Sequence, residues 1–265
     1  MNTTTKGAGV PSLNQTEKSS KEDIKFWSMR AKRYNSLEWV NKGDYLHAFL
    51  EAGAFHEDDA VLDVGTGTGI IAHTISPFVK RVVGVDISED MIRQAANPAF
   101  RNVEWKRMDA HDLQFPGGTF DRVTARMVFH HVTSRTQEAM AECNRVLKKN
   151  GVMVFSEGVP PTRHVVPFYT EMFKLKEDRI TFMDEDLIRL MKTAGFRSIK
   201  KKIYMNRGAS IKNWLVNSGI PQKNQDAIFK MHVELDTRGK RDYNMVLKDG
   251  DCFIDMKFVI LTGVK

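Results

Sequence analysis

Residues 60–69, Ala-Val-Leu-Asp-Val-Gly-Thr-Gly-Thr-Gly, decide the fold class of this chain. The apolar run predicts a buried strand. The three alternating glycines predict a tight turn, because glycine lacks Cβ and adopts positive φ without strain. Residues 70–75, Ile-Ile-Ala-His-Thr-Ile, then have helical spacing. Strand, glycine turn and helix in this order form the context in which main-chain N–H groups bind a nucleotide or nucleoside.

A second predicted strand, residues 81–86, ends in Asp86, about 20 residues after the first glycine. In a doubly wound sheet, this position lies beside the ribose of a bound nucleoside, and a carboxylate there accepts hydrogen bonds from both ribose hydroxyls. A glycine turn combined with a spaced terminal acid is a stronger signal than glycines alone. We therefore expect a cofactor that contains a nucleoside.

NAD(P) and S-adenosylmethionine (SAM) both fit this pattern, and the residues around the turn favour SAM. Asp63 lies just before Gly65, where a carboxylate would repel the pyrophosphate of a dinucleotide but attract the sulfonium and ammonium groups of SAM. The dinucleotide fingerprint also places its third glycine where this chain has Ile70. The alternative role for Asp63 is to hold the glycine turn through its amides.

Four further motifs resemble those of the class I SAM-dependent methyltransferases: residues 85–91 (Val-Asp-Ile-Ser-Glu-Asp-Met), 108–110 (Met-Asp-Ala), 120–123 (Phe-Asp-Arg-Val) and 145–151 (Arg-Val-Leu-Lys-Lys-Asn-Gly). The resemblance implies an α/β, Rossmann-like fold with a doubly wound, mainly parallel seven-stranded sheet, whose last two strands form an antiparallel pair at one edge. Together with the charge argument, it implies a set of cofactor-binding residues: Tyr34, Asp63, Gly65, Thr66, Gly67, Gly69, Asp86, Ile87, Asp109, Ala110 and Arg126. Core packing is the alternative for Tyr34 and Ile87, and a turn start for Asp109.

Candidate catalytic residues follow the ends of the fourth and fifth predicted strands, where open α/β sheets bind ligands. His130 and His131 follow the strand at 121–126, and a histidine can deprotonate a phenol, thiol or enol near neutral pH. We expect His131 to be the base, with local packing as its alternative. Glu157 is a second candidate, with a structural hydrogen bond as its alternative. The His130–His131 pair lacks a third ligand at a recognisable spacing, so we expect no metal.

The sequence favours a small-molecule acceptor over nucleic acid. Residues 125–127, Ala-Arg-Met, replace the Asn/Asp-Pro-Pro-aromatic pattern typical of methylases that act on base amino groups. Residues 145–157 resemble the signature of ubiquinone/menaquinone C-methyltransferases, although Lys149, Asn150 and Ser156 depart from it. The resemblance therefore implies a quinone-like or other ring-bearing acceptor. A protein or nucleic-acid methyltransferase, a nicotinamide oxidoreductase and a non-catalytic SAM-binding protein are the alternatives.

Composition is that of an ordinary soluble globule, with 42% hydrophobic and 28% charged residues. The net charge of +7 is spread along the chain, and its one tight run, residues 200–202, predicts an exposed strand. No apolar run approaches the ~20 residues of a membrane span, and the N-terminus lacks the apolar centre of a signal peptide. We therefore expect a cytoplasmic protein with reduced Cys143 and Cys252.

The predicted domains are a disordered tail over residues 1–21 and a methyltransferase domain over residues 22–265, which begins with a helical cap at 22–55. Ser134 and Gln137 predict a capping box for the helix after the fourth strand, and Gly151 predicts its end. Residues 206–251 predict a helical insertion over the active site, with surface decoration or a homodimer contact as the alternative. Strands are expected at 60–64, 81–86, 102–107, 121–126, 151–157, 197–205 and 252–262.

Overall fold

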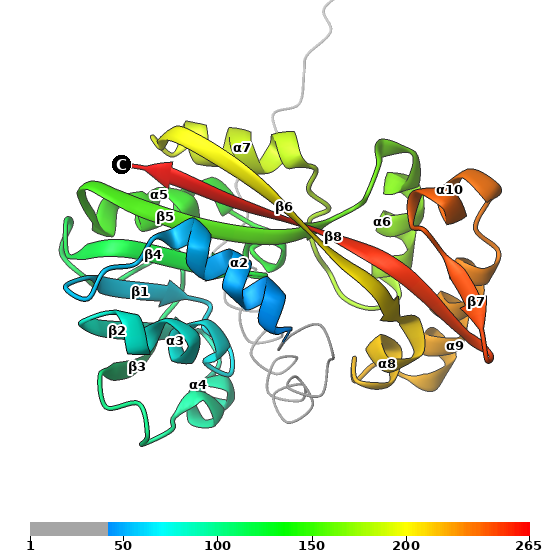
Figure 1. Ribbon diagram of the computed structural model, residues 1–265, viewed down its shortest axis with the longest axis horizontal. Coiled ribbons are helices and arrows are strands. Elements are labelled where there is room, and N and C mark those ends of the chain that lie inside the picture. The colour runs from blue at the N-terminus through cyan, green and yellow to red at the C-terminus, as the bar shows by residue number, and fades with distance from the viewer. Residues whose placement is uncertain (1–41) are drawn as a thin grey trace, which may run out of the picture.

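A computed structural model describes residues 42–265, which form an eight-stranded sheet flanked by helices (Figure 1). The strands are β1 (Ala60–Val64), β2 (Arg81–Asp86), β3 (Val103–Arg107), β4 (Phe120–Arg126), β5 (Leu147–Val159), β6 (Arg197–Ser210), β7 (Val246–Lys248) and β8 (Asp251–Val264). The helices of the first half are α2 (Gly43–Gly53), α3 (Ile70–Ile75), α4 (Glu89–Ala95) and α5 (Thr136–Val146). Those of the second half are α6 (Val166–Lys174), α7 (Asp184–Thr193), α8 (Ile211–Val216), α9 (Gln222–Val233) and α10 (Thr237–Asp242).

The order of the strands confirms the fold predicted from the sequence. Seven strands follow the path β3-β2-β1-β4-β5-β8-β6, and β1 to β5 pair in parallel. The last long strand, β8, runs antiparallel to both β5 and β6, as expected for the edge pair. The chain therefore reverses its strand order between β1 and β4, which places a ligand site at the carboxyl ends of these strands.

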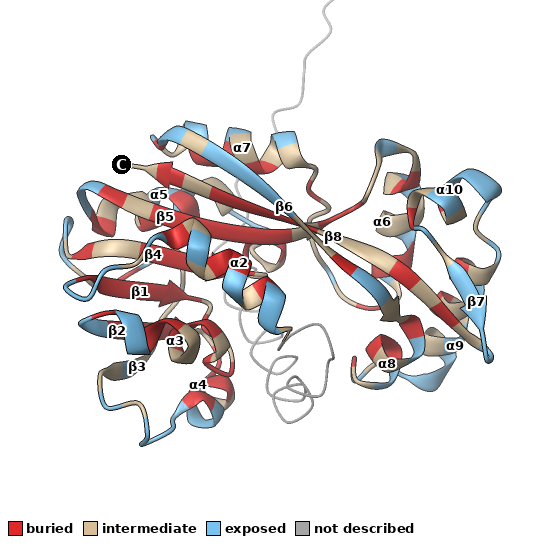
Figure 2. Ribbon diagram, in the orientation of Figure 1, coloured by how far each residue is buried: buried red, intermediate tan, exposed pale blue. Residues whose placement is uncertain are grey.

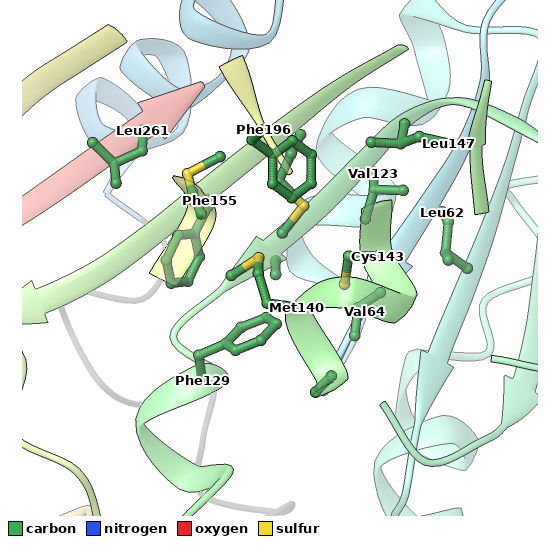
Figure 3. Close-up of a cluster of buried hydrophobic side chains, with 14 of the residues drawn as sticks. Leu62, Val64, Val123, Phe129, Met140, Cys143, Leu147, Phe155, Phe196 and Leu261 are labelled. Carbon is green, nitrogen blue, oxygen red and sulfur yellow. The ribbon is translucent and has the colours of Figure 1, made fainter. Parts of the chain in front are cut away.

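The two faces of the sheet are buried by different helices. All five residues of β1 are buried, because alternate side chains point to opposite faces and both faces are covered. Val61 packs in the cluster that contains side chains of α2 and α3. Leu62 and Val64 pack in the other cluster, with Met140 and Cys143 of α5 (Figure 3). Figure 2 accordingly shows β1 coloured as buried in the middle of the sheet.

Two local predictions were wrong, and one strand was not predicted. The helix α5 begins after Arg135, which adopts a left-handed conformation, and no side chain caps it, so Ser134 and Gln137 form no capping box. The same helix ends at Val146 and passes directly into β5, because Leu147 pairs with Phe120 of β4. Gly151 is therefore a strand residue and does not end the helix. The eighth strand, β7, was not expected, and it forms a hairpin with β8.

The region between β6 and β8 carries α8, α9, α10 and β7, which lie with α6 at one end of the molecule (Figure 1). β6 continues to Ser210, so the helices begin later than the predicted boundary at residue 206. Residues 200–202 lie in an exposed part of β6, as predicted. Within residues 42–265, no helix is long and apolar enough to cross a membrane. The predicted tail at 1–21, Tyr34 and most of the predicted cap at 22–55 lie outside the described residues.

Candidate active site

The glycine turn has the conformation that its sequence requires. Gly65, Gly67 and Gly69 have φ values of 63°, 55° and 82°, a region that side chains disfavour. A Cβ at Gly65 would lie 2.4 Å from Val128, and one at Gly69 would lie 2.7 Å from Trp105. A Cβ at Gly67 would meet nothing within 4 Å. Gly65 and Gly69 thus permit close packing, whereas Gly67 presents bare backbone to open space.

Asp86 joins the glycine turn to the end of β2. Its Oδ2 accepts a hydrogen bond from the Gly67 amide at 2.9 Å, and its Oδ1 accepts one from the Ser88 amide, also at 2.9 Å. Burial raises the pKa of Asp86 above its ordinary value. The carboxylate is therefore oriented by two backbone donors before any ligand binds.

Asp63 contacts the glycine turn through its side chain. Its carboxylate accepts hydrogen bonds from the hydroxyls of Thr66 at 2.6 Å and Thr124 at 2.7 Å, and its side chain is buried. Burial raises the pKa of Asp63 to about 6, although both hydroxyls and the nearby Arg126 guanidinium oppose this rise. Asp63 thus contacts the turn through the Thr66 hydroxyl and not through the amides that the alternative role required, and it also lines the cleft described next.

A cleft of about 1390 Å³, including its open mouth, extends along the carboxyl ends of β1, β2 and β4. We call it the glycine-loop cleft. Most of the predicted cofactor-binding residues line it: Asp63, Gly65, Thr66, Gly67, Asp86, Ile87, Asp109, Ala110 and Arg126. Gly69 is absent from this lining and instead precedes α3 as its N-cap residue. Tyr34, the remaining predicted residue, is outside the described part of the chain.

The far end of the cleft contains a residue that the sequence analysis missed. His111 lines the cleft, and its Nδ1 lies 2.6 Å from Oδ1 of Asp109. This contact lowers the pKa of Asp109 and raises that of His111. Its Nε2 lies 3.0 Å from the Ser134 carbonyl oxygen. The position of His111 two residues after an expected ligand-binding acid was the available signal.

His131 lines the cleft beside Val128 and Arg126. Burial, and then the neighbouring His130, lower the pKa of His131 well below its usual value of 6.5. The imidazole is therefore neutral at pH 7 and has a nitrogen that can accept a proton. Its side chain therefore forms part of the wall that a ligand in the cleft would face.

Glu157 lies behind the wall of the cleft and does not line it. It is fully buried at the end of β5, where its Oε1 accepts hydrogen bonds from the amides of Val128 at 3.0 Å and Phe129 at 2.7 Å. Its Oε2 pairs with Nδ1 of His130. Burial raises the pKa of Glu157 to about 7. The structure thus gives Glu157 the structural hydrogen bonds that were the alternative to catalysis.

The sequence offers no third metal ligand at a recognisable spacing from His130 and His131, but the folded chain brings one close to them. Ligand atoms of His130, His131 and Glu177 lie within 4.8 Å of one another. However, the Glu177 carboxylate pairs with Lys176, and it lies 3.6 Å from Arg179. Two cations that share this carboxylate oppose a third positive charge. The cluster therefore carries no metal assignment.

Comparisons with known proteins agree with this architecture. The family of methyltransferase domains matches residues 62–155. Over 156 residues the chain is 29% identical to an uncharacterized methyltransferase, YcgJ of Bacillus subtilis, covering 57% of this chain and 61% of YcgJ. Over 113 residues it is 38% identical to a demethylmenaquinone methyltransferase of Tropheryma whipplei, covering 42% of this chain and 46% of that protein. The chain thus spans less than two thirds of the length of either relative.

Solved structures share the fold. The crystal structure of YcgJ superimposes with a TM-score of 0.74 at 21% identity, covering 84% of this chain and 98% of YcgJ. A Haemonchus contortus phosphoethanolamine N-methyltransferase, in complex with S-adenosylhomocysteine, superimposes with a TM-score of 0.62 at 18% identity, covering 89% of this chain and 56% of that protein. The matched domain at residues 62–155 and the strand order of the sheet thus make this part of the chain a methyltransferase domain with the class I fold, and its sequence is similar to that of demethylmenaquinone methyltransferases.

Proposed function

We propose that the chain binds SAM in the glycine-loop cleft and transfers its methyl group to a small-molecule acceptor that carries an apolar ring. The observation that carries this proposal is the placement of Asp86. Its oriented carboxylate, the bare backbone of Gly67 and the pair of Asp109 with His111 all lie along one cleft. A nucleoside therefore meets a ribose acceptor at one end and an acceptor for an amino group at the other.

The residues of the cleft fit SAM. Asp86 would accept hydrogen bonds from the ribose hydroxyls, and Asp109 would accept one from the adenine amino group beside Ile87. The carboxylate of Asp63 lies close to the glycine turn, where its charge favours a cation over a pyrophosphate. When bound, SAM supplies an electrophilic methyl group for an in-line displacement.

The chain's own contribution is positioning and proton transfer. Alignment of two reactants in a closed site is worth about 7–11 kcal/mol, so a methyltransferase needs few catalytic groups. His131 is the candidate base, and Glu157 is a positioning residue that fixes the turn carrying both histidines. Names of relatives add weight to the acceptor class, because two demethylmenaquinone methyltransferases of Tropheryma whipplei are each 38% identical over 113 residues.

Calorimetric titration with SAM tests the cofactor assignment. Loss of the Asp86 carboxylate removes two hydrogen bonds to a charged group, each worth about 1.5–3 kcal/mol. Asp86→Ala should therefore weaken SAM by about 100-fold or more, and Asp86→Asn, which keeps one acceptor oxygen, by about tenfold. Asp58→Ala, at an exposed position before β1, should leave the affinity unchanged. Equal affinities in all four proteins would refute the assignment.

Methyl-labelled SAM and a panel of quinols, phenols, thiols and amines test the transfer step. We expect methylation of a ring-bearing acceptor. His131→Asn should lower the rate by about 100- to 10,000-fold if the imidazole accepts a proton in the transition state. Because the pKa of His131 lies well below 6.5, the wild-type rate should be constant around pH 7 and fall only in acid. An unchanged rate and pH profile in the variant would exclude His131 as the base.

A further inference from the structure

A second pocket lies outside the glycine-loop cleft, among α6, α8, α9 and the far parts of β6 and β8. We call it the insertion pocket. It measures about 730 Å³ including its mouth, and its walls are rich in apolar and aromatic side chains, among them Tyr169, Phe173 and Trp214. Figure 1 shows these helices gathered around one end of the long antiparallel strands. Such a lining suits an apolar ring system.

One polar side chain in this pocket has an unsatisfied atom. Asn206 lines the pocket and is only 2% exposed, yet its Oδ1 has no hydrogen-bond partner among residues 42–265. Its Nδ2 makes only a long contact, 4.0 Å, to the sulfur of Met256. A bulge in the pairing of β6 with β8 follows immediately, between Asn206 and Ala209. A buried amide oxygen without a partner is costly, so a ligand group that donates to it is favoured.

The charged side chains of the pocket limit the kinds of ligand that it can bind. Among the described residues that line it, the charged ones are Lys42 and Lys257, and none is a carboxylate. Lys257 is paired with Asp184 at 2.7 Å. His232 packs edge-on against Trp214, and burial lowers its pKa to about 4, so it is neutral. The pocket thus disfavours a cationic ligand and admits a neutral or anionic one.

The partition between the two pockets is thin. Met127 lines the glycine-loop cleft, and Gly158 lines the insertion pocket. The Gly158 amide lies 3.1 Å from Sδ of Met127, and a Cβ at Gly158 would lie 3.3 Å from Cε of Met127. The wall here is therefore one flexible thioether side chain against bare backbone. Methionine side chains are flexible and adaptable, so a ligand that spans both spaces would have to displace Met127 and no backbone at this point.

We propose that the insertion pocket binds the apolar body of the methyl acceptor, a hydroxylated aromatic compound whose hydroxyl pairs with Asn206. The acceptor's reactive end reaches the glycine-loop cleft past Met127. A hydroxyl suits the site because it can donate to Oδ1 and accept from Nδ2 of the same amide. The role as acceptor pocket rests on the function proposed above, whereas binding of the hydroxylated ring does not.

The experiment is equilibrium dialysis of the full chain with 2-naphthol and with 2-methylnaphthalene, which differ only in a hydroxyl against a methyl group. Wild-type protein should bind one naphthol per chain and prefer it by about 3- to 10-fold, the size of one hydrogen bond. Asn206→Leu should abolish the preference and leave the affinity for SAM unchanged. Failure of both probes to bind, or a preference that survives in Asn206→Leu, would overturn the proposal.

Two further measurements keep the outcomes separate. If Asn206→Leu fails to fold, a crystal structure of the wild-type chain with 2-naphthol decides: its hydroxyl should lie within hydrogen-bond distance of Asn206, and any other place contradicts the proposal. Titration of the wild type with SAM tests the proposed function independently. If the wild type prefers naphthol but does not bind SAM, the aromatic site stands and the proposed methyl transfer is refuted. If it binds SAM but not naphthol, the aromatic site is refuted and the proposed function stands.

Discussion

Replacement of Gly67 by alanine tests two properties of the glycine turn separately, its contribution to stability and its contribution to cofactor binding. Gly67 has φ of 55°, and a Cβ there meets no atom within 4 Å. Alanine therefore costs only the left-handed conformation, about 1–2 kcal/mol. For a chain of this size, that predicts a drop in melting temperature of about 2–8 °C. The added methyl group, however, would stand in the cleft where we place the cofactor, beside the amide that donates to Asp86.

Gly118→Ala is a matched control. Gly118 also has positive φ, 75°, and open space around its missing Cβ, but it precedes the amino end of β4, whereas the cleft lies at the carboxyl ends of the strands. Calorimetry with SAM and thermal unfolding should be measured on both variants. We expect equal losses of melting temperature, and a loss of SAM affinity of about 5- to 150-fold in Gly67→Ala alone, the effect of about 1–3 kcal/mol of steric conflict. Unchanged SAM affinity in Gly67→Ala would refute the placement of the cofactor against this turn.

Two further predictions concern buried carboxylates. Glu157→Ala leaves the amides of Val128 and Phe129 without an acceptor and should lower the free energy of unfolding by about 3–5 kcal/mol. Glu157→Gln, which keeps an acceptor oxygen, should lower it much less. Equal losses of the two variants in denaturant titrations would contradict this prediction. Burial raises the pKa of Asp63 from 3.8 to about 6, so between these pH values the folded protein binds one more proton than the unfolded chain. The stability that this carboxyl group contributes is therefore present in acid and is lost as pH rises through about 6. Relative to wild type, Asp63→Asn should therefore gain about 1–2 kcal/mol of unfolding free energy between pH 5 and pH 8, and a constant difference between the two proteins would show that Asp63 does not titrate there.

The sequence predicted the sheet because its strands are marked by strong local signals. Residues 60–64 and 81–86 are mainly apolar runs that end at a glycine turn or an acid, and both form strands within these bounds. The hairpin of β7 was missed although Asp249-Gly250 is a strong turn signal. Asp249 and Gly250 have φ values of 50° and 71°, as such a turn requires.

The start of α5 could not be read from local sequence. Ser134 has the side chain of a good N-cap, but its carbonyl oxygen lies 3.0 Å from Nε2 of His111, a residue far away in the chain. The left-handed conformation of Arg135 then makes Arg135 the N-cap residue, one position after the one that the capping box required. The end of α5 was misplaced for the same reason, since pairing of Leu147 with Phe120 is also a long-range contact.

The candidate site likewise contains some features that local sequence predicts and others that depend on tertiary packing. The order of strand, turn and acid predicted that Asp86 and the glycines would share a cleft, because topology alone brings the ends of parallel strands together. The partners of Asp63 on β4 and of Glu157 on the His130 turn depend on tertiary packing. Sequence spacing therefore identified Glu157 as a polar residue at a strand end but could not tell a residue of the cleft from one behind its wall.

A crystal structure of the chain with S-adenosylhomocysteine tests the central claim most directly. The account predicts the ribose hydroxyls within hydrogen-bond distance of the Asp86 carboxylate, the adenine between Ile87 and Asp109, and the amino-acid end against the turn at residues 65–67. The compound bound elsewhere, or no compound bound at a concentration that saturates other methyltransferases, would contradict it.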